Sequence, residues 1–293
     1  YQAKQAGKNR YHLFDVERDT AVKTQREEVA RLHQALAAHE FVLHYQPKVN
    51  MRTGQVIGAE ALIRWNHPQR GLLPPAAFLP TMHDHAIRLE VGDWVIATAL
   101  QQMATWKSQG LDLPVSVNID AQHLQKEGFS QRLAALLAAQ PQVPASHLEL
   151  EILETSALED MAQVSAIMHR CQAMGVRFAL DDFGTGYSSL TYLKRLGAEV
   201  IKIDQSFVRD MQTDPDDLAI VQGVIGLARA FHREVIAEGV ETIAHGSVLL
   251  PLGCECAQGY GIARPMPAGE LPQWVQHWRP DRAWTTAAAA TPG

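Results

Sequence analysis

Two adjacent carboxylates, Asp181 and Asp182, are the residues of this chain whose spacing most directly suggests chemistry. They follow the apolar run Phe178-Ala179-Leu180 and precede a turn that contains glycine. Neighbouring aspartates repel each other and lose solvation when buried, and a divalent cation is a common way to neutralise them. A solvated turn with an Asp cap has the same local sequence. The pair alone therefore leaves two interpretations open.

Further polar residues stand at or near the ends of strand-like segments: Glu60, Asn118, Glu151, Lys202, Glu238 and Gln258. Because strand side chains alternate between two faces, the apolar residues of each segment would pack outward and these polar ones would point inward. Barrel enzymes place their chemistry at the carboxyl ends of their strands. Taken singly, a strand-end Glu or Asp is more often a helix cap or a surface charge, and a residue such as Lys202 is more often a salt-bridge partner.

Together, the carboxylates and the amide of this set are hard oxygen ligands, which favour Mg²⁺ or Mn²⁺ over Zn²⁺. One ion takes about six ligands including waters, so five carboxylates exceed the need of one ion. Two ions that share a carboxylate would use them all, and such a pair activates water and stabilises the leaving oxygen in phosphoester hydrolysis. The sequence therefore predicts a two-metal site, with Lys202 orienting the nucleophile or neutralising phosphate charge.

Eight strand-like segments would position these residues, at 41–47, 56–64, 115–119, 148–152, 177–181, 199–203, 234–238 and 253–258. Helical patterns occur at 18–39, 90–108, 121–139, 157–174, 214–231 and 267–278. This alternation predicts an α/β chain folded as an irregular (β/α)8 TIM-type barrel. The segment 50–54 reads as a hairpin connection, so the first strand is expected to run antiparallel to the others.

The amino-acid composition and net charge limit the kinds of function that this chain can have. The 293 residues are 46% hydrophobic, which is enough for one large core, and the net charge of −6 argues against binding a nucleic-acid polymer. The three cysteines, an odd number, are typical of a reducing compartment, and we expect a cytoplasmic location. No apolar run reaches the roughly 18 residues of a membrane span, so no membrane contact by this fragment is expected. The Ala/Thr/Pro/Gly-rich end predicts a disordered tail over 281–293.

Several motifs occur in a fixed order: Tyr45-Gln46-Pro47, Glu60-Ala61-Leu62, the stretch 181–190, Lys202-Ile203-Asp204, Glu238-Gly239-Val240-Glu241 and Gln258-Gly259-Tyr260. In these residues the chain resembles the EAL domain, a bacterial phosphodiesterase that hydrolyses cyclic di-GMP. The resemblance covers roughly 25–280, and the barrel domain is expected over 40–280. It implies hydrolysis of cyclic di-GMP to linear 5′-pGpG with two Mg²⁺ or Mn²⁺ ions.

The resemblance also implies residue roles. The metal ligands would be Glu60, Asn118, Glu151, Asp181, Asp182 and Glu238. The catalytic set would be Glu60, Asp181, Asp182 and Lys202, with Lys202 contacting the attacking water. Substrate would be bound by Gln46, Arg64, Gln258 and Glu241. Glu154 would anchor the regulatory loop that contains Phe183, Gly184, Thr185 and Gly186, near a homodimer interface formed by the region after Asp182.

Two departures from the family pattern stand out. Leu153 occupies a position where the family usually has Thr, which removes a hydroxyl near the loop anchor. The segment 79–85 differs from the more usual acidic Ala-Glu-type sequence of the family, which affects the substrate-side loop. Neither departure removes a predicted metal ligand.

The N-terminal residues 1–15 resemble the end of a GGDEF domain, the diguanylate cyclase module. Residues 16–39 would then be a helical linker, and the parent protein a GGDEF–EAL tandem that can carry a membrane anchor elsewhere.

Two alternatives remain open. A degenerate domain could bind cyclic di-GMP as a receptor without cleaving it, which tight binding without pGpG formation would reveal. On the residues alone, a barrel enzyme of the enolase type would also use carboxylate ligands and a strand-end lysine. The adjacent pair Asp181-Asp182 fits two-metal phosphoester chemistry better.

Overall fold

A computed structural model of the chain describes residues 16–82, 86–158, 160–186 and 190–286. The chain divides into two compact units. The smaller unit consists of residues 1–42 and 64–91, and the larger unit consists of residues 43–63 and 92–293. The strands β1 (Phe41–Asn50) and β2 (Val56–His67) belong partly to each.

The larger unit is built on a closed barrel of eight strands, as the sequence predicted. The remaining strands are β4 (Val115–Asn118), β5 (Leu148–Leu153), β6 (Arg177–Phe183), β7 (Val200–Ile203), β8 (Glu234–Ala237) and β9 (Cys256–Ala257). Each pairs in parallel with the next, from β2 through β4 to β9. Strand β1 pairs antiparallel with β9 and also pairs with β2, which closes the ring. The expected antiparallel first strand is therefore confirmed.

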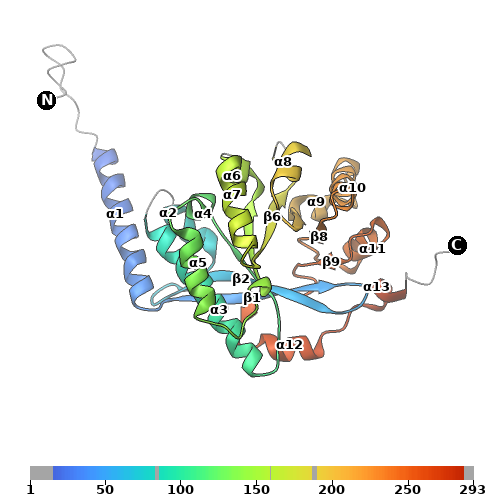
Figure 1. Cartoon of the computed structure of the whole chain (residues 1–293), viewed down its shortest axis with the longest axis horizontal. Coiled ribbons are helices and arrows are strands. Elements are labelled where there is room, and N and C mark those ends of the chain that lie inside the picture. The colour runs from blue at the N-terminus through green and yellow to red at the C-terminus, as the bar shows by residue number, and fades with distance from the viewer. Residues whose placement is uncertain (1–15, 83–85, 159, 187–189, 287–293) are drawn as a thin grey trace, which may run out of the picture. The chain divides into compact units, whose positions relative to one another are not determined.

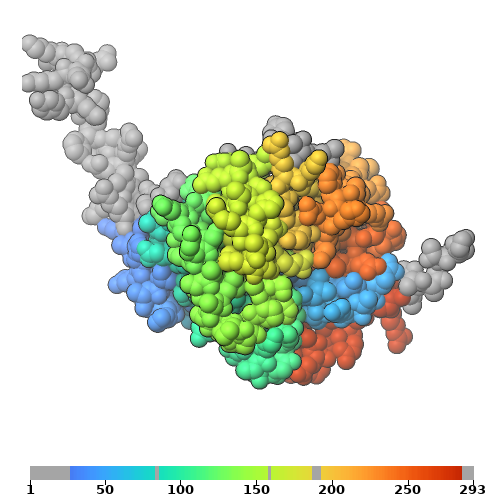
Figure 2. All heavy atoms as spheres, viewed as in Figure 1, coloured from blue at the N-terminus to red at the C-terminus, as the bar shows by residue number. Residues whose placement is uncertain are grey.

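Helices follow most strands and cover the parallel part of the barrel (Figure 1). They are α3 (Ile87–Ser108), α4 (Ala121–Leu124), α5 (Phe129–Ala138), α6 (Glu154–Leu158), α7 (Met161–Gln172), α8 (Leu190–Arg195), α9 (Gln205–Asp210), α10 (Pro215–Ala230) and α11 (Ile243–Leu252). In Figure 2 the green-to-orange side chains of these helices hide the parallel strands, while the pale-blue β1–β2 hairpin reaches the surface.

Two predicted helices are each divided in two. The segment 121–139 forms α4 and α5, because Gly128 adopts a left-handed conformation (φ 79°) just before α5 begins. The segment 157–174 forms α6 and α7, since the Asp160 side chain accepts a hydrogen bond from the Gln163 amide and starts a new helix.

Strand alternation sorts polar from apolar side chains as expected. On β5, Leu148, Leu150 and Ile152 are fully buried on one face, and Glu149 and Glu151 are buried on the other. Small apolar residues from β6, β7 and β8 (Ala179, Val200 and Ile236) form a separate buried cluster. The barrel interior thus combines apolar packing with buried charge.

The smaller unit comprises α1 (Val16–Ala37), the outer parts of β1 and β2, β3 (Gly71–Leu73), a 3₁₀ turn (Pro75–Ala77) and α2 (Leu79–Met82). Glu40 links its parts, because one carboxylate oxygen accepts hydrogen bonds from Arg31 (2.6 Å) and from the Trp65 indole (2.8 Å). Arg31 also lies over the Trp65 ring. Helix α1 lies within the helical segment predicted over 16–39.

The expected disorder from residue 281 onward is wrong for 282–286. These residues form helix α13 (Arg282–Thr286), after β10 (Met266–Pro267) and α12 (Leu271–His277). The Trp284 side chain is buried, and its indole donates to the Ile243 carbonyl at 2.9 Å. A side chain at Gly246 of α11 would collide with this indole, so glycine permits the contact between α11 and α13 (Figure 1). Residues 1–15 and 287–293 lie outside the described residues.

No described helix combines the length and apolar character that crossing a bilayer requires.

Trp284→Ala should lower the free energy of unfolding by about 3 kcal/mol, because it removes a buried indole and its hydrogen bond. Urea unfolding followed by circular dichroism measures this loss. The matched control is Thr285→Ala at an exposed position of the same helix, where a change within about 0.5 kcal/mol is expected. Equal stability of the two variants would show that α13 does not pack on the barrel.

Candidate functional site

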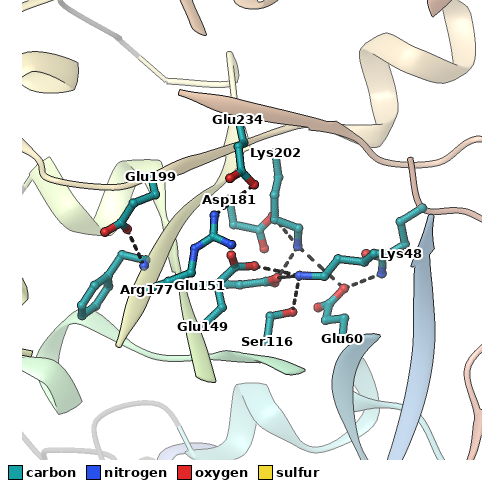
Figure 3. A network of polar contacts seen from close by, with 12 residues as sticks. Lys48, Glu60, Ser116, Glu149, Glu151, Arg177, Asp181, Glu199, Lys202 and Glu234 are labelled. Carbon is teal, nitrogen blue, oxygen red and sulfur yellow. Dashed lines mark hydrogen bonds and ion pairs between the residues drawn. The ribbon is translucent and has the colours of Figure 1, made fainter. Parts of the chain in front are cut away.

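The buried ammonium group of Lys202 on β7 is the centre of the candidate site. Its Nζ lies 2.6 Å from Glu151 Oε2, 2.7 Å from Glu238 Oε1 and 3.0 Å from Asp181 Oδ1. A fourth carboxylate, Glu60, lies 3.7 Å away. The strands β2, β5, β6 and β7 and the residue after β8 therefore bring together carboxylates that the sequence predicted. Figure 3 shows three of them, Glu60, Glu151 and Asp181, near Lys202.

Two amide side chains fix the orientation of Glu60, and a third amide contacts one of them. Asn118 donates to its Oε1 at 2.7 Å, and Gln258 donates to its Oε2 at 2.6 Å. The same Gln258 nitrogen lies 2.9 Å from Gln46 Oε1, and Gln46 donates to the Ala263 carbonyl. Each carboxylate oxygen of Glu60 therefore accepts a hydrogen bond from an amide side chain, which fixes the orientation of the carboxylate.

A β-bulge explains how Asp181 and Asp182 can serve one site. Regular alternation would send the two side chains to opposite faces of β6. The register between β6 and β7 shifts between Leu180 and Phe183, and Asp182 adopts a left-handed conformation with φ 52°. As a result, one oxygen from each of Asp181, Asp182 and Glu238 lies within 4.8 Å of the others. The bulge changes the direction of the backbone, so that the carboxylates of Asp181 and Asp182 lie close to each other.

The electrostatics of these groups differ sharply. Burial, together with the neighbouring Asp181, raises the pKa of Asp182 to about 7. Burial raises the pKa of Glu238 to about 8, although Lys202 opposes the shift. For Glu151 burial acts in the same direction, but Lys202 and Lys48 outweigh it and lower the pKa to about 2. The pKa values of Glu60 and Asp181 are also raised by burial.

These residues fit a divalent cation. Four carboxylates (Glu60, Glu151, Asp181 and Glu238) lie within 3.7 Å of Lys202 Nζ, and Asp182 lies beside two of them, so negative charge is in excess around this ammonium group. Two of their buried oxygens, Glu151 Oε1 and Asp181 Oδ1, lie beside a lysine yet accept no well-aligned hydrogen bond from any described residue. Clustered carboxylate oxygens in a region of excess negative charge are the environment that Mg²⁺ and Mn²⁺ prefer.

The loop after β6 is tied to helix α6. Glu154 accepts a hydrogen bond from the Gly184 amide at 3.0 Å, and the Thr185 hydroxyl donates to the Asp182 carbonyl at 2.8 Å. Phe183 is buried, and Gly186 lies close to the Glu154 carboxylate. Glu154 thus contacts this loop, and its role as the loop anchor stays a prediction. Residues 187–189 lie outside the described residues.

An open pocket of about 210 Å³ lies over the carboxylates. Its lining includes Gln46, Gln258 and Glu241, three of the residues expected to bind substrate, together with Tyr260. The fourth, Arg64, belongs to the smaller unit, and its role stays a prediction. The side chain of Leu153, at the position where the family usually has Thr, is exposed.

Two buried residues of this region received no role from the sequence. Asp204 caps α9 by accepting from the Ser206 amide at 2.9 Å, and its hydrogen bond with Asp182 contributes to the raised pKa of Asp182. The second is Lys48 on β1, which contacts Glu149 and Glu151. The motif Lys202-Ile203-Asp204 was a signal that could have found Asp204, whereas no local pattern pointed to Lys48.

Comparison with known proteins gives consistent results. The family described as "EAL domain" matches residues 29–265. MucR of Pseudomonas aeruginosa, named a bifunctional diguanylate cyclase/cyclic di-GMP phosphodiesterase, is 41% identical over 92% of this chain and 40% of its own length. The cyclic di-GMP phosphodiesterase PA2567 of the same organism is 39% identical over 84% of this chain and 42% of its own length. The chain thus spans about two fifths of these relatives.

Two solved structures are similar to this chain in both fold and sequence. The phosphodiesterase of MucR in complex with c-di-GMP superposes with a TM-score of 0.80 at 42% identity, covering 84% of this chain and 99% of that one. The EAL enzyme Bd1971, bound to cAMP and cyclic di-GMP, gives a TM-score of 0.82 at 32% identity, covering 87% and 70%. With the barrel, the bulge and the carboxylates around Lys202 in place, these matches show that the chain belongs to the EAL domain family.

Proposed function

We propose that this chain hydrolyses one phosphodiester bond of cyclic di-GMP and releases linear 5′-pGpG. The observation that carries the proposal is the convergence of four carboxylates on the buried Lys202, with Asp182 beside them, beneath an open pocket. Relatives named as cyclic di-GMP phosphodiesterases support the choice of substrate. The similar phosphodiesterase of MucR was solved with this dinucleotide bound.

Two divalent ions, Mg²⁺ or Mn²⁺, would be held by overlapping sets of ligands. One set consists of Glu60, Asn118, Glu151 and Asp181, and the other of Asp181, Asp182 and Glu238. The compact second set supports the proposal, because its three carboxylates already approach one another. When bound, the ions would supply Lewis acidity toward a water molecule and the phosphate oxygens.

The side chains of the protein have distinct tasks in this proposal. Lys202 compensates the negative charge of the surrounding carboxylates. Its fully buried ammonium group also orients the attacking water. Gln258 lines the pocket, and its buried Oε1 has no described hydrogen-bond partner, so it is available as an acceptor for the ligand. Arg64 contacts a phosphate and stabilises the charge that develops there.

A receptor that binds cyclic di-GMP without cleaving it is the less favoured alternative. Degenerate domains of this kind would lack a metal ligand or have a broken loop after Asp181. Here each predicted ligand from Glu60 to Glu238 is present, and the Glu154–Gly184 contact is formed.

Three further expectations concern the oligomeric state, the parent protein and the cellular location. We propose a homodimer through the region after Asp182 and a parent protein in which residues 1–15 end a GGDEF domain. A cytoplasmic location is consistent with the three cysteines, which are all free thiols.

The substitution Glu60→Ala tests the reaction directly. It removes a carboxylate that Asn118 and Gln258 hold in place, and turnover should fall by roughly 10²-fold or more. Chromatography of products formed from cyclic di-GMP in excess Mn²⁺, with and without chelator, measures the effect. Glu127→Ala, at an exposed position, is the matched control. Turnover near the unsubstituted rate in Glu60→Ala would refute the assignment.

Metal binding should depend on pH. Because burial raises the pKa of Asp182 to about 7 and that of Glu238 to about 8, both carboxyls retain protons near neutral pH and must lose them to bind metal. The affinity for Mn²⁺ should therefore rise between about pH 6 and 9, with release of on the order of one proton at pH 7. Calorimetry in buffers of different protonation heat measures this release. Asp182→Asn should release less, and a buffer-independent heat would contradict the prediction.

The loop anchor gives a separate prediction. Glu154→Ala removes the acceptor of the Gly184 amide and should lower kcat about tenfold by loosening the loop that begins at Asp182. Glu154→Gln keeps a carbonyl oxygen at this position and should retain most of the activity. Steady-state kinetics compare the two variants, and equal rates would show that this hydrogen bond does not serve the site.

A further inference from the structure

A second lysine, Lys48, is buried inside the barrel. It stands on β1 two residues after Gln46 and therefore on the same inward face. Since β1 runs opposite to its neighbours, Lys48 lies further from the carboxyl ends of the parallel strands than Gln46 does. Its Nζ lies 2.7 Å from Glu149 Oε1, 3.0 Å from Ser116 Oγ and 3.5 Å from Glu151 Oε1 (Figure 3).

The contact with Glu151 connects Lys48 to the candidate metal site. Lys202 binds Oε2 of Glu151 at 2.6 Å, and Lys48 approaches the other oxygen, so the carboxylate lies between two ammonium groups. Glu60 differs, because amides direct its two oxygens. The described ion pairs thus give Glu151 a lysine at each carboxylate oxygen.

The surroundings of Lys48 accommodate a long cationic side chain. Gly58 faces inward two residues before Glu60, and a Cβ there would lie 3.3 Å from Lys48 Cε and 3.1 Å from the Pro114 carbonyl. Glycine therefore leaves room for the lysine stem. Glu149, one inward position before Glu151 on β5, balances the charge of Lys48. The positive charge of Lys48 and the negative charge of Glu149 cancel, so this pair adds no net charge to the barrel interior.

We propose that Lys48 is a positioning residue that holds Glu151 in the orientation required for metal binding. The inference rests on the proposed metal site. Lys202 contacts one oxygen of Glu151, Oε2, and Ser116 adds a neutral hydrogen bond to the carboxylate. Attraction from Lys48 on the second oxygen restricts rotation of the carboxylate. Groups that orient ligands in this way typically change metal affinity or activity by 10–100-fold when removed.

The test replaces the Lys48–Glu149 pair as a unit, so that neither charge is left buried alone. In the double variant Lys48→Met with Glu149→Gln, the affinity for Mn²⁺ should fall about tenfold, as measured by calorimetry without nucleotide. Lys48→Arg keeps a positive charge and should retain an affinity within about threefold of the unsubstituted protein. A crystal structure of the double variant without metal should show a displaced Glu151 side chain.

The matched control replaces an exposed pair of the same chemistry, Lys107→Met with Asp112→Asn, and should leave Mn²⁺ affinity unchanged. Thermal unfolding in chelator verifies folding. Should the Met/Gln variant not fold, Lys48→Gln with Glu149→Gln makes the same comparison with paired amides. Unchanged Mn²⁺ affinity in the folded double variant would overturn the role of Lys48. Failure of the unsubstituted protein to bind Mn²⁺ would instead overturn the metal site itself, and with it this inference.

Discussion

The imbalance of charge around Lys202 is the constraint on which the rest of the site depends. One buried ammonium group attracts four carboxylates, and Asp182 adds a fifth beside them. Without further positive charge, some of these groups can remain in the fold only by retaining protons, and the raised pKa values of Asp182 and Glu238 express that cost. Bound cations would remove this cost, which is why the cluster suits a divalent metal ion.

Because β1 runs antiparallel to β9, the residues along β1 go from the pocket inward, whereas those of the parallel strands go outward toward the pocket. Going along β1, the chain passes Gln46 near the pocket before it reaches Lys48 further inside. On the parallel β5 the order is the opposite, with Glu149 before Glu151. The antiparallel β1 and the parallel β5 therefore place Lys48 and Glu149 at matching depths in the barrel.

Much of this arrangement could be predicted from the chain alone. The eight strands, the antiparallel first strand and the inward carboxylates all follow from local alternation and from a hairpin between the first two strands. The role of Lys48 could not be predicted, because its partners are distant in sequence and a lysine in an apolar segment carries no periodic signal. Helix α13 was missed because its composition resembles that of a disordered segment, whereas packing of Trp284 on Gly246 decides its structure.

The bulge at Asp182 is a point where local stability and chemistry oppose each other. A left-handed backbone (φ 52°) suits glycine better than aspartate, and the carboxylate is also repelled by Asp181. Glycine at this position would relieve both penalties, so a selection for stability alone would favour the loss of the carboxylate. The aspartate is retained at the expense of the fold. Engineering that raises the melting temperature of this domain without monitoring catalysis would therefore tend to erase the site first.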